Sequence, residues 1–418
     1  MRTGIGAAEA LRIVLENAPA LPAERVPAAR ALGRILCEPI RAGRDLPPAD
    51  NSAMDGYAVR RADLLGAAPE RPVELALAFE VAAGALAARA LRAGEAARIL
   101  TGAPIPPGAD AVVRQEDVER VGEGLRLRAA PGPGENVRPA GEDVRAGEEV
   151  LAAGTRLGPA ELGMLAALGR SQVAVHQRPR VALLSSGDEL VEPDGDLRGG
   201  RIASSNSSSL AAQCRELGLE PVYLGIARDT PEDLERIFRA GLSADLVVSS
   251  AGVSVGDRDY VRGVLEKLGA SLLFFGVQIK PGYPLVFARL PREAGPLFFG
   301  LPGNPVSAMV TFEEFVRPAL RQMMGHRALF RPTLRARLAE RLAKPAGRLH
   351  FVRVRLERRG GEIVAFATGN QSSGVLRSLT RAQGLLLFPA EETELAPGAS
   401  AAVQVLDPDF LAAEEPGF

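Results

Sequence analysis

The chain has 418 residues, of which 46% are apolar and 24% charged, and its formal net charge is −1. This composition is typical of a globular protein with roughly two to four domains, and it offers no excess of basic residues for nucleic acid or an anionic membrane. No apolar run approaches the roughly 20 residues that span a bilayer, and the N-terminus lacks a signal-peptide pattern. We therefore expect a cytoplasmic protein.

The cysteines and histidines are few and scattered. Cys37 and Cys214 show no pair spacing, which favours a reducing compartment over a disulfide scaffold. The three histidines do not cluster with them, so no His/Cys zinc site is expected. Only Lys267, Lys280 and Lys344 are lysines, and the other 47 basic residues are arginines. This rarity of lysine marks Lys280 as a candidate functional residue.

Residues 1–44 and 137–178 are predicted to form one domain of mixed helical and β structure. Residues 6–18 have helical periodicity, and a second helix is expected over Pro159–Leu168. The Ala- and Leu-rich segment Ala28–Leu36 has so few polar positions that it must be buried, which a second subunit could provide. This domain is our candidate for a dimer interface.

Residues 45–136 are predicted to form a small inserted β module, because short apolar runs alternate there with Gly and Pro breaks. Turn-forming residues crowd its start, at 50–55, and Asp55-Gly56 allows a tight turn that presents a carboxylate. A simple hairpin entry is the alternative. The loop at 101–108 is either a barrel corner or a means of presenting the Thr101 hydroxyl to a ligand.

From residue 179 to 326 strands alternate with helices, which predicts a three-layer α/β domain with a mostly parallel sheet. Strands are expected at Val181–Ser185, Val222–Ala227 and Asp245–Ser249, with a helix after each. Residues 327–418 are β-like without a strong helix, and Glu357–Glu362 is predicted to be a hairpin turn. The fold class is therefore multidomain α/β plus β, ending in a barrel-like C-terminal domain.

Acidic residues follow three successive strands of the α/β domain. Glu189, Asp229 and Asp259 would meet in one crevice, because ligands bind at the carboxyl ends of parallel strands. Carboxylates without His or Cys suit a hard cation, best Mg²⁺. The alternative is that each acid caps the helix that follows it. Three acids at equivalent strand ends favour the metal-binding interpretation.

A cation and a helix start lie close together between Gln278 and Ser307. Lys280-Pro281-Gly282 precedes one expected strand, and Pro302-Gly303-Asn304-Pro305 follows the next. Asn304 fits a helix N-cap and Pro305 the first helical position. A lysine beside free N–H groups at a helix N-terminus is able to hold an anion. Two strand ends broken by Pro and Gly are the simpler alternative.

Several motifs of the chain resemble those of the molybdopterin molybdenumtransferases (MoeA type, similar to the gephyrin E domain), and they occur in the same order. They are DNSAMDGYAV at 50–59, TGAPIPPGADAVVRQE at 101–116, GENVRPAGEDVRAGE at 134–148, SSGDEL at 185–190, AGVSVGDRDY at 251–260, IKPGYP at 279–284 and GLPGNPVSA at 300–308. The resemblance covers essentially the whole chain.

The resemblance implies a four-domain, elongated homodimer that inserts molybdate into adenylylated molybdopterin, with Mg²⁺-dependent release of AMP. The α/β domain of one subunit would share each active site with the β module and C-terminal domain of the other. The preceding molybdopterin adenylyltransferase is a possible partner. By motif match, the residues with catalytic roles are Asp55, Asp229, Asp259 and Lys280. Those that would hold the metal are Asp229, Ser254, Asp259 and Glu189. Those that would bind substrate are Thr101, Gly187, Asp188, Glu189, Gly252, Ser254, Pro281, Pro302, Asn304, Pro305, Ser307, Arg348, Arg353 and Ser373.

The chain departs from the family pattern at the anion-binding loop. Gly276 and Tyr283 stand where the family usually has lysine, and Ala251 stands where it usually has glycine. Loss of two cations should weaken binding of an oxyanion, since each charge-assisted contact contributes roughly 1.5–3 kcal/mol. A nearby arginine could compensate. The alternatives are a non-catalytic pterin-binding or scaffold paralogue and a transferase that prefers tungstate.

Overall fold

The computed structural model describes residues 2–251, 260–291 and 295–412, and the predicted site residues Gly252, Ser254 and Asp259 lie outside these ranges. The chain divides into two compact units: unit 1 contains residues 1–24 and 176–418, and unit 2 contains residues 25–175. No helix in the described part of the chain is both long and apolar enough to cross a bilayer.

The larger part of unit 2 is the predicted β module, which is confirmed. Its six strands are β5 (Gly56–Val59), β6 (Val73–Val81), β7 (Glu95–Ile99), β8 (Ala111–Arg114), β9 (Val118–Val121) and β10 (Gly124–Leu127). They form one sheet in the order β8-β5-β7-β6-β10-β9. Two apolar clusters fill the module, one including Tyr57 and Leu125 and the other including Ile99 and Val112.

The rest of unit 2 has little regular structure. Helix α2 (Pro159–Ala167) is accompanied by the strand pairs β2–β13 (Ala23–Pro27 and Gln172–His176), β3–β12 (Ile40–Arg41 and Glu149–Leu151) and β4–β11 (Asn51–Ser52 and Val137–Arg138). The segment Ala28–Leu36 forms only a short 3-10 helix, η1 (Ala28–Arg30). Ala31 and Leu36 are nevertheless fully buried in a cluster with Leu165 of α2. Unit 2 therefore buries part of this apolar segment itself, whereas Leu32 is 57% exposed.

The α/β part of unit 1 is built on a seven-stranded sheet in the order β1-β19-β21-β22-β18-β14-β17. The strands are β1 (Arg2–Ile5), β14 (Val181–Ser186), β17 (Val222–Ala227), β18 (Leu246–Ser250), β19 (Ser271–Val277), β21 (Val286–Arg289) and β22 (Leu297–Leu301). Strands β17, β14, β18 and β22 run parallel, and β21 is antiparallel to both of its neighbours. The mostly parallel sheet is thus confirmed.

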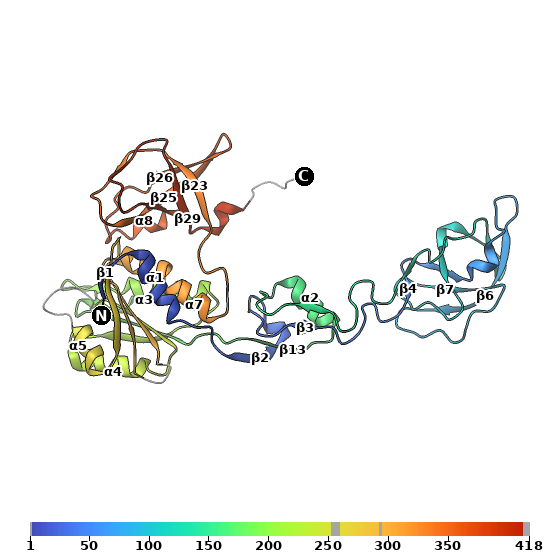
Figure 1. Cartoon of the computed structure of the whole chain (residues 1–418), viewed down its shortest axis with the longest axis horizontal. Coiled ribbons are helices and arrows are strands. Elements are labelled where there is room, and N and C mark those ends of the chain that lie inside the picture. Colours follow the sequence, from blue (N-terminus) through green and yellow to red (C-terminus); the bar gives the residue numbers. More distant parts are fainter. Residues whose placement is uncertain (1, 252–259, 292–294, 413–418) are drawn as a thin grey trace. The chain divides into compact units, whose positions relative to one another are not determined.

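Helices cover both faces of this sheet, which makes the domain three-layered (Figure 1). On one face α1 (Ala7–Glu16), α3 (Ser205–Glu216), α6 (Pro305–Thr311) and α7 (Arg317–Met323) pack in one apolar cluster. On the other face α4 (Pro231–Gly241) and α5 (Tyr260–Lys267) pack in a second cluster. The sequence interpretation grouped the N-terminus with 137–178, whereas here β1 pairs with β19 and α1 packs on this sheet.

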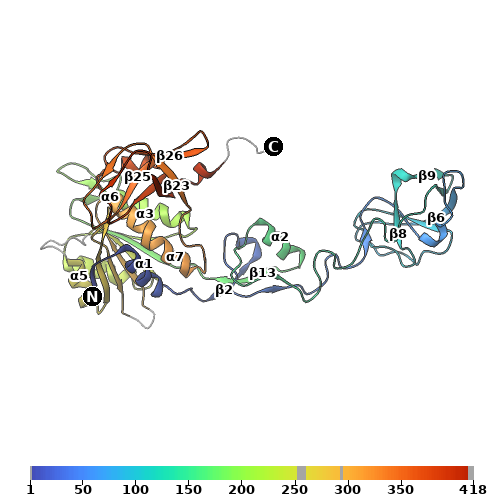
Figure 2. The same ribbon diagram turned by 45° about the horizontal axis from the view of Figure 1, so that its top comes forward.

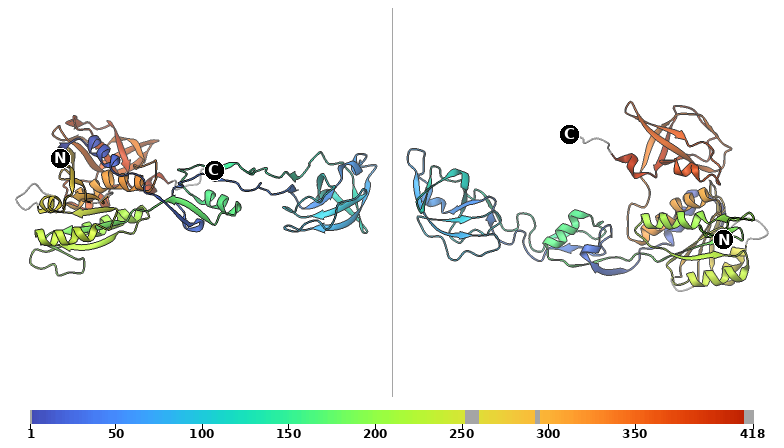
Figure 3. Two further views of the ribbon diagram at one scale, coloured as in Figure 1. Left: turned by 60° about the horizontal axis from the view of Figure 1, so that its bottom comes forward. Right: turned by 180° about the vertical axis from the view of Figure 1, so that it is seen from behind.

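The C-terminal part of unit 1 is a closed five-stranded barrel, as expected (Figure 3). Its strands are β23 (Thr333–Leu338), β25 (Leu349–Arg359), β26 (Glu362–Ala367), β27 (Gly384–Phe388) and β29 (Ser400–Val405). The predicted hairpin turn is confirmed, with Gly360 and Gly361 at φ +54° and +84°, the left-handed pair that a type I′ turn needs. The barrel joins the α/β part because β20 (Ile279–Lys280) pairs with β25.

Candidate active site

The carboxyl ends of four parallel strands meet at one edge of the sheet, which we call the strand-end edge. Strand β14 leads into Asp188 and Glu189, and β17 leads into Asp229. Strand β18 leads into Ala251, and β22 into the segment 302–305 before α6. The sequence prediction that acids from successive strands gather here holds for β14 and β17, which are neighbours in the sheet.

Hydrogen bonds hold the first two acidic loops together. The Asp229 N–H donates to Oδ1 of Asp188 at 3.2 Å, and the Gly187 N–H donates to the Ala227 carbonyl at 3.2 Å. Gly187 has φ +148°, and a Cβ there would lie 2.7 Å from Oε2 of Glu189. Glycine at 187 therefore lets the Glu189 carboxylate fold back over the loop.

The strand-end edge offers only oxygen donors from these acids, which fits Mg²⁺ better than a soft metal. Among the described residues, however, no group of three or more His, Cys, Asp or Glu side chains is arranged to hold a metal ion. The predicted metal ligands Ser254 and Asp259 lie outside the described ranges.

A buried polar layer that the sequence interpretation missed lies beneath the edge. Nδ2 of Asn206 donates to Ser250 Oγ at 2.6 Å and to the Gly303 carbonyl at 2.8 Å, so it connects α3 with the last residue of β18 and with the loop after β22. Ser204 occupies the N-cap position of α3 but makes no side-chain cap bond, and its hydroxyl instead lies 3.1 Å from Ser185 Oγ. A run of Ser and Asn reads as capping in a sequence, and only the fold shows that it faces the strand ends.

The helix predicted after Asn304 begins where expected, at Pro305, and Asn304 occupies the N-cap position. Its side chain makes no cap bond, and the Val306 N–H donates to the carbonyl of Ser373 at 3.1 Å. The N-terminus of α6 is therefore not wholly free for an anion, because a barrel loop occupies one donor. The same contact brings the predicted residue Ser373 next to the strand-end edge, where α6 lies close to the barrel (Figure 2).

A pocket of about 160 Å³ lies where β20 meets the barrel, and we call it the cation pocket. The polar side chains that line it are Lys280, Lys344, His350, Arg353 and Gln371. The pairing of β20 with β25 sets Lys280 beside His350. Pro281 follows Lys280 in a cis peptide bond and is buried. The pocket thus brings together the predicted Lys280 and Arg353.

The Arg353 side chain is only 2% exposed, and its hydrogen bonds go to neutral oxygens. Nε donates to Ser378 Oγ at 3.1 Å, while the two terminal nitrogens donate to the Phe351 and Ser372 carbonyls at 3.4 and 3.3 Å. Burial lowers the pKa of Arg353 to about 10, so the guanidinium is still charged at neutral pH. No carboxylate in the described part of the chain forms an ion pair with it.

Lys344 and His350 line the same pocket and were not predicted. Lys344 is 8% exposed, its Nζ donates to the Ala390 carbonyl at 3.1 Å, and burial lowers its pKa. Burial, together with the charges of Lys280, Lys344 and Arg348, lowers the pKa of His350 to about 4, so this imidazole is neutral at pH 7. The rarity of lysine in this chain was the one sequence signal that could have drawn attention to Lys344.

Arg348, the other arginine proposed for oxyanion binding, does not line the cation pocket. It lies just before β25, and its guanidinium stacks over the ring of Tyr283 at 4.6 Å from the centroid.

In unit 2, Asp55 and Thr101 contact each other as the spacing of the two motifs allows. Oδ1 of Asp55 accepts hydrogen bonds from both the N–H and the hydroxyl of Thr101, each at 2.7 Å. These two bonds lower the pKa of Asp55 and keep the exposed carboxylate ionised. The pair is therefore preformed within unit 2.

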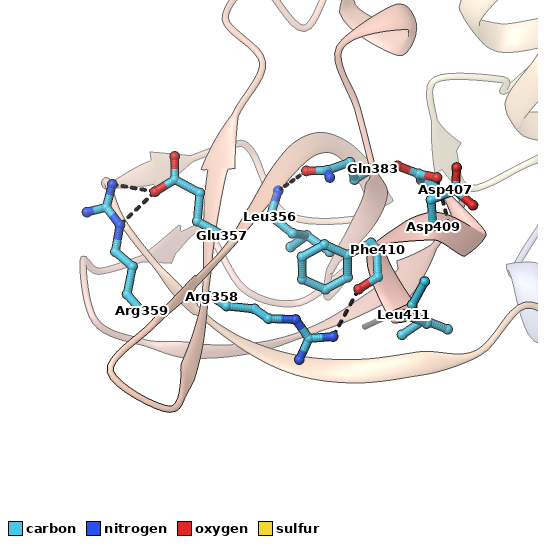
Figure 4. Close-up of a pocket in the computed structure, with 10 residues that line it drawn as sticks. Leu356, Glu357, Arg358, Arg359, Gln383, Asp407, Asp409, Phe410 and Leu411 are labelled. Atoms are coloured by element: carbon cyan, nitrogen blue, oxygen red, sulfur yellow. Dashed lines mark hydrogen bonds and ion pairs between the residues drawn. The ribbon is translucent and has the colours of Figure 1, made fainter. Parts of the chain in front are cut away.

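A larger cavity, of about 1010 Å³, lies on the barrel at its β25–β26 hairpin (Figure 4). Arg358 and Arg359 line it, but Arg358 donates to the Phe410 carbonyl and Arg359 to Glu357. Arg359 is thus paired with a carboxylate, whereas no ion pair of Lys280, Lys344 or Arg353 occurs in the described part of the chain.

Carboxylates at parallel strand ends and buried cations in an adjoining barrel are the groups found in proteins of the class that handles phosphate and oxyanion ligands. Family models match three stretches: the MoeA N-terminal region (domain I and II) over residues 5–169, a probable molybdopterin binding domain over 182–322, and the MoeA C-terminal region (domain IV) over 335–406. The chain belongs to the MoeA family of molybdopterin molybdenumtransferases, a family of enzymes.

Relatives match over most of the chain. A molybdopterin molybdenumtransferase from Nostoc sp. is 41% identical over 88% of this chain and 85% of its own length. Molybdopterin molybdenumtransferase 2 of Mycobacterium tuberculosis is 39% identical over 93% and 96%. The crystal structure of the molybdopterin biosynthesis MoeA protein from Pyrococcus horikosii, 33% identical, covers 96% of this chain and 99% of its own, with a TM-score of 0.83. The resemblance inferred from the motifs is therefore confirmed.

Proposed function

We propose that this protein inserts molybdate into adenylylated molybdopterin and releases AMP in a Mg²⁺-dependent step. The observation that carries the proposal is the cation pocket: Lys280, Lys344 and Arg353 come together there without a carboxylate partner among the described residues. A dianion such as molybdate would supply the missing negative charge. The names of the relatives, which are molybdenumtransferases acting on molybdopterin, support this choice of oxyanion.

The buried cations are suited to hold an oxyanion. Hydrogen bonds in which a partner is charged are shorter and stronger than neutral ones, and burial removes the competition of water. The planar guanidinium of Arg353 can bind two oxygens at once. His350, being neutral, would contribute a hydrogen bond without another positive charge.

The strand-end edge is proposed to receive the phosphates. The carbonyl of Ser373 accepts a hydrogen bond from the Val306 N–H of α6, at the strand-end edge. The neighbouring Ser372 carbonyl accepts one from Arg353, so the same barrel loop connects the edge with the cation pocket. Asp229 and Glu189, with Ser254 and Asp259, would hold Mg²⁺, which neutralises phosphoryl oxygens when bound. Asp188 keeps the loops after β14 and β17 in register through the Asp229 N–H.

The proposal extends to the assembly, the compartment and the partner of the protein. The enzyme acts as a cytoplasmic homodimer in which Asp55 and Thr101 of unit 2 reach the active site of the other subunit. Its substrate comes from a molybdopterin adenylyltransferase, which is the proposed partner. The preformed bond between Asp55 and Thr101 supports a fixed carboxylate in this role.

The proposal is tested by incubating the purified chain with adenylylated molybdopterin, Mg²⁺ and molybdate and measuring AMP. Multiple turnovers that require both molybdate and Mg²⁺ are expected. Substrate binding without AMP release would contradict the proposal and indicate the scaffold paralogue. Faster release with tungstate than with molybdate would identify a tungstate-preferring transferase.

A further inference from the structure

The ring of Tyr283, close in sequence to Lys280 of the cation pocket, contacts Arg348, which lies outside that pocket. Tyr283 follows the Lys280-Pro281-Gly282 turn, and Cζ of Arg348 lies 4.6 Å from the centre of its ring. This separation is within the range of a cation–π interaction. The two segments are also joined through their backbones, since the Leu349 N–H donates to the Gln278 carbonyl at 3.1 Å.

Gly276 makes room for this ring. A Cβ at position 276 would lie 3.1 Å from Cζ and 3.2 Å from the hydroxyl oxygen of Tyr283. The backbone at 276 has φ +77°, which glycine adopts without strain. Backbone bonds fix the same place: the Gly276 N–H donates to the Leu285 carbonyl at 2.8 Å, and the Val277 N–H to the Tyr283 carbonyl at 2.9 Å. The Tyr283 ring is therefore held in place against Gly276.

The charge of Arg348 lies close to the cation pocket. Arg348 directly precedes β25, which carries His350 and Arg353, and its charge acts on His350 together with those of Lys280 and Lys344. The Arg348 side chain is exposed, and no ion pair or side-chain hydrogen bond of Arg348 occurs in the described part of the chain. A long exposed side chain loses conformational freedom only if something holds it, and here the ring does so.

We infer that Tyr283 is a positioning residue: seated on Gly276, it holds the Arg348 guanidinium beside the cation pocket so that its charge contributes to oxyanion affinity. This inference rests on the proposed function, because it assigns an oxyanion to the pocket. It also explains how Tyr283 and Gly276 can serve an anion site although neither carries a charge. The positive charge comes from Arg348 of the barrel, and the loop supplies the Tyr283 ring on which the guanidinium stacks.

The test is a calorimetric titration of the full chain with molybdate. Tyr283→Leu and Arg348→Ala should each raise the Kd about twofold to fivefold, the range of an exposed cation–π contact. The double variant should bind no more weakly than the weaker single variant, because each change removes the same contact. Tyr283→Phe keeps the ring and should bind like the wild type. Phe366→Leu is the matched control, since Arg355 and Arg359 stack on that ring elsewhere on the barrel.

In steady-state assays Tyr283→Leu should raise the KM for molybdate and leave kcat unchanged, which a general loss of structure would not do. Unchanged molybdate affinity in Tyr283→Leu, or additive losses of affinity in the double variant, would overturn the inference. If the wild-type protein still released AMP, the proposed function would stand. The expected binding pattern without AMP release would sustain the inference and reject the transferase. A wild-type chain that does not bind molybdate would overturn the inference.

Discussion

The strand-end edge and the cation pocket belong to the same unit, but they treat charge in different ways. Asp188 and Glu189 at the edge are exposed, so water screens their mutual repulsion. Arg353 and Lys344 in the pocket are 2% and 8% exposed, and their hydrogen bonds go to neutral oxygens. Burying a cation without an anion costs free energy. The pocket therefore carries a cost in stability that the edge does not, which is the cost expected of the proposed oxyanion site.

The largest expected effect is at the edge. Asp229→Asn should lower turnover by about 100-fold or more, because removing a charged group that acts on the transition state typically costs several kcal/mol. The melting temperature should change little. Glu232→Gln, an exposed acid in the first turn of α4, is the matched control and should keep full turnover. Turnover of Asp229→Asn within threefold of the wild type would remove Asp229 from the active site.

At the pocket we expect the main effect on binding of the oxyanion rather than on turnover. Arg353→Met should weaken molybdate binding roughly 10- to 100-fold, since charge-assisted bonds contribute about 1.5–3 kcal/mol. The free energy of unfolding should fall little, because the variant also removes a buried charge without a carboxylate partner. Arg355→Met, on the same strand but exposed and paired with Glu357, is the control. A large loss of stability with unchanged molybdate affinity would show that Arg353 is structural.

The pH dependence of stability sharpens the comparison further. His350 has a pKa of about 4 when folded, below its value of roughly 6.5 when unfolded, so the unfolded state binds more protons between these pH values. The contribution of His350 to stability is thus present above pH 6.5 and lost as the pH falls toward 4. His350→Gln should reduce the fall in unfolding free energy across this window by about 1–2 kcal/mol, after discounting for partial exposure.

Urea denaturation at pH 7 and pH 4.5 measures this difference, and His326→Gln controls for the loss of an imidazole elsewhere in unit 1. Equal pH dependence in His350→Gln and the wild type would mean that His350 is not held neutral by the pocket.

The smallest expected effect lies in unit 2. Thr101→Val removes the hydroxyl that donates to Asp55 and keeps the N–H that also does so. The pKa of Asp55 should rise toward its ordinary value, and the acidic limb of the profile of kcat/KM against pH should move upward with it. Thr101→Ser is the control that keeps the hydroxyl. An unmoved acidic limb in Thr101→Val would separate Asp55 from the rate.

Local patterns predicted much of the fold. The strand Val222–Ala227 has the same bounds in the structure, and the helix expected after Asn304 begins at Pro305. Apolar runs between Gly, Pro and capping residues are sufficient for this. The strand ends also follow from local reading, because acids directly after parallel strands must lie at one edge.

The cation pocket could be predicted only in part. Lys280 and Arg353 came from motifs, but Lys344, His350 and Gln371 join them because β20 pairs with β25 and the barrel closes. Such long-range register is not encoded in any one segment. The use of Asn206 beneath the edge, and of Gly276 as a seat for Tyr283, depends on contacts of the same kind.

The most direct test of the central claim, that the cation pocket holds the oxyanion, is a crystal structure of the chain soaked with tungstate or molybdate. The anomalous signal of the heavy metal marks its position without ambiguity. A peak among Lys280, Lys344 and Arg353 is the predicted result. A peak only at the outer cavity beside Arg358 and Arg359, or an empty pocket at an oxyanion concentration that supports turnover, would contradict the account.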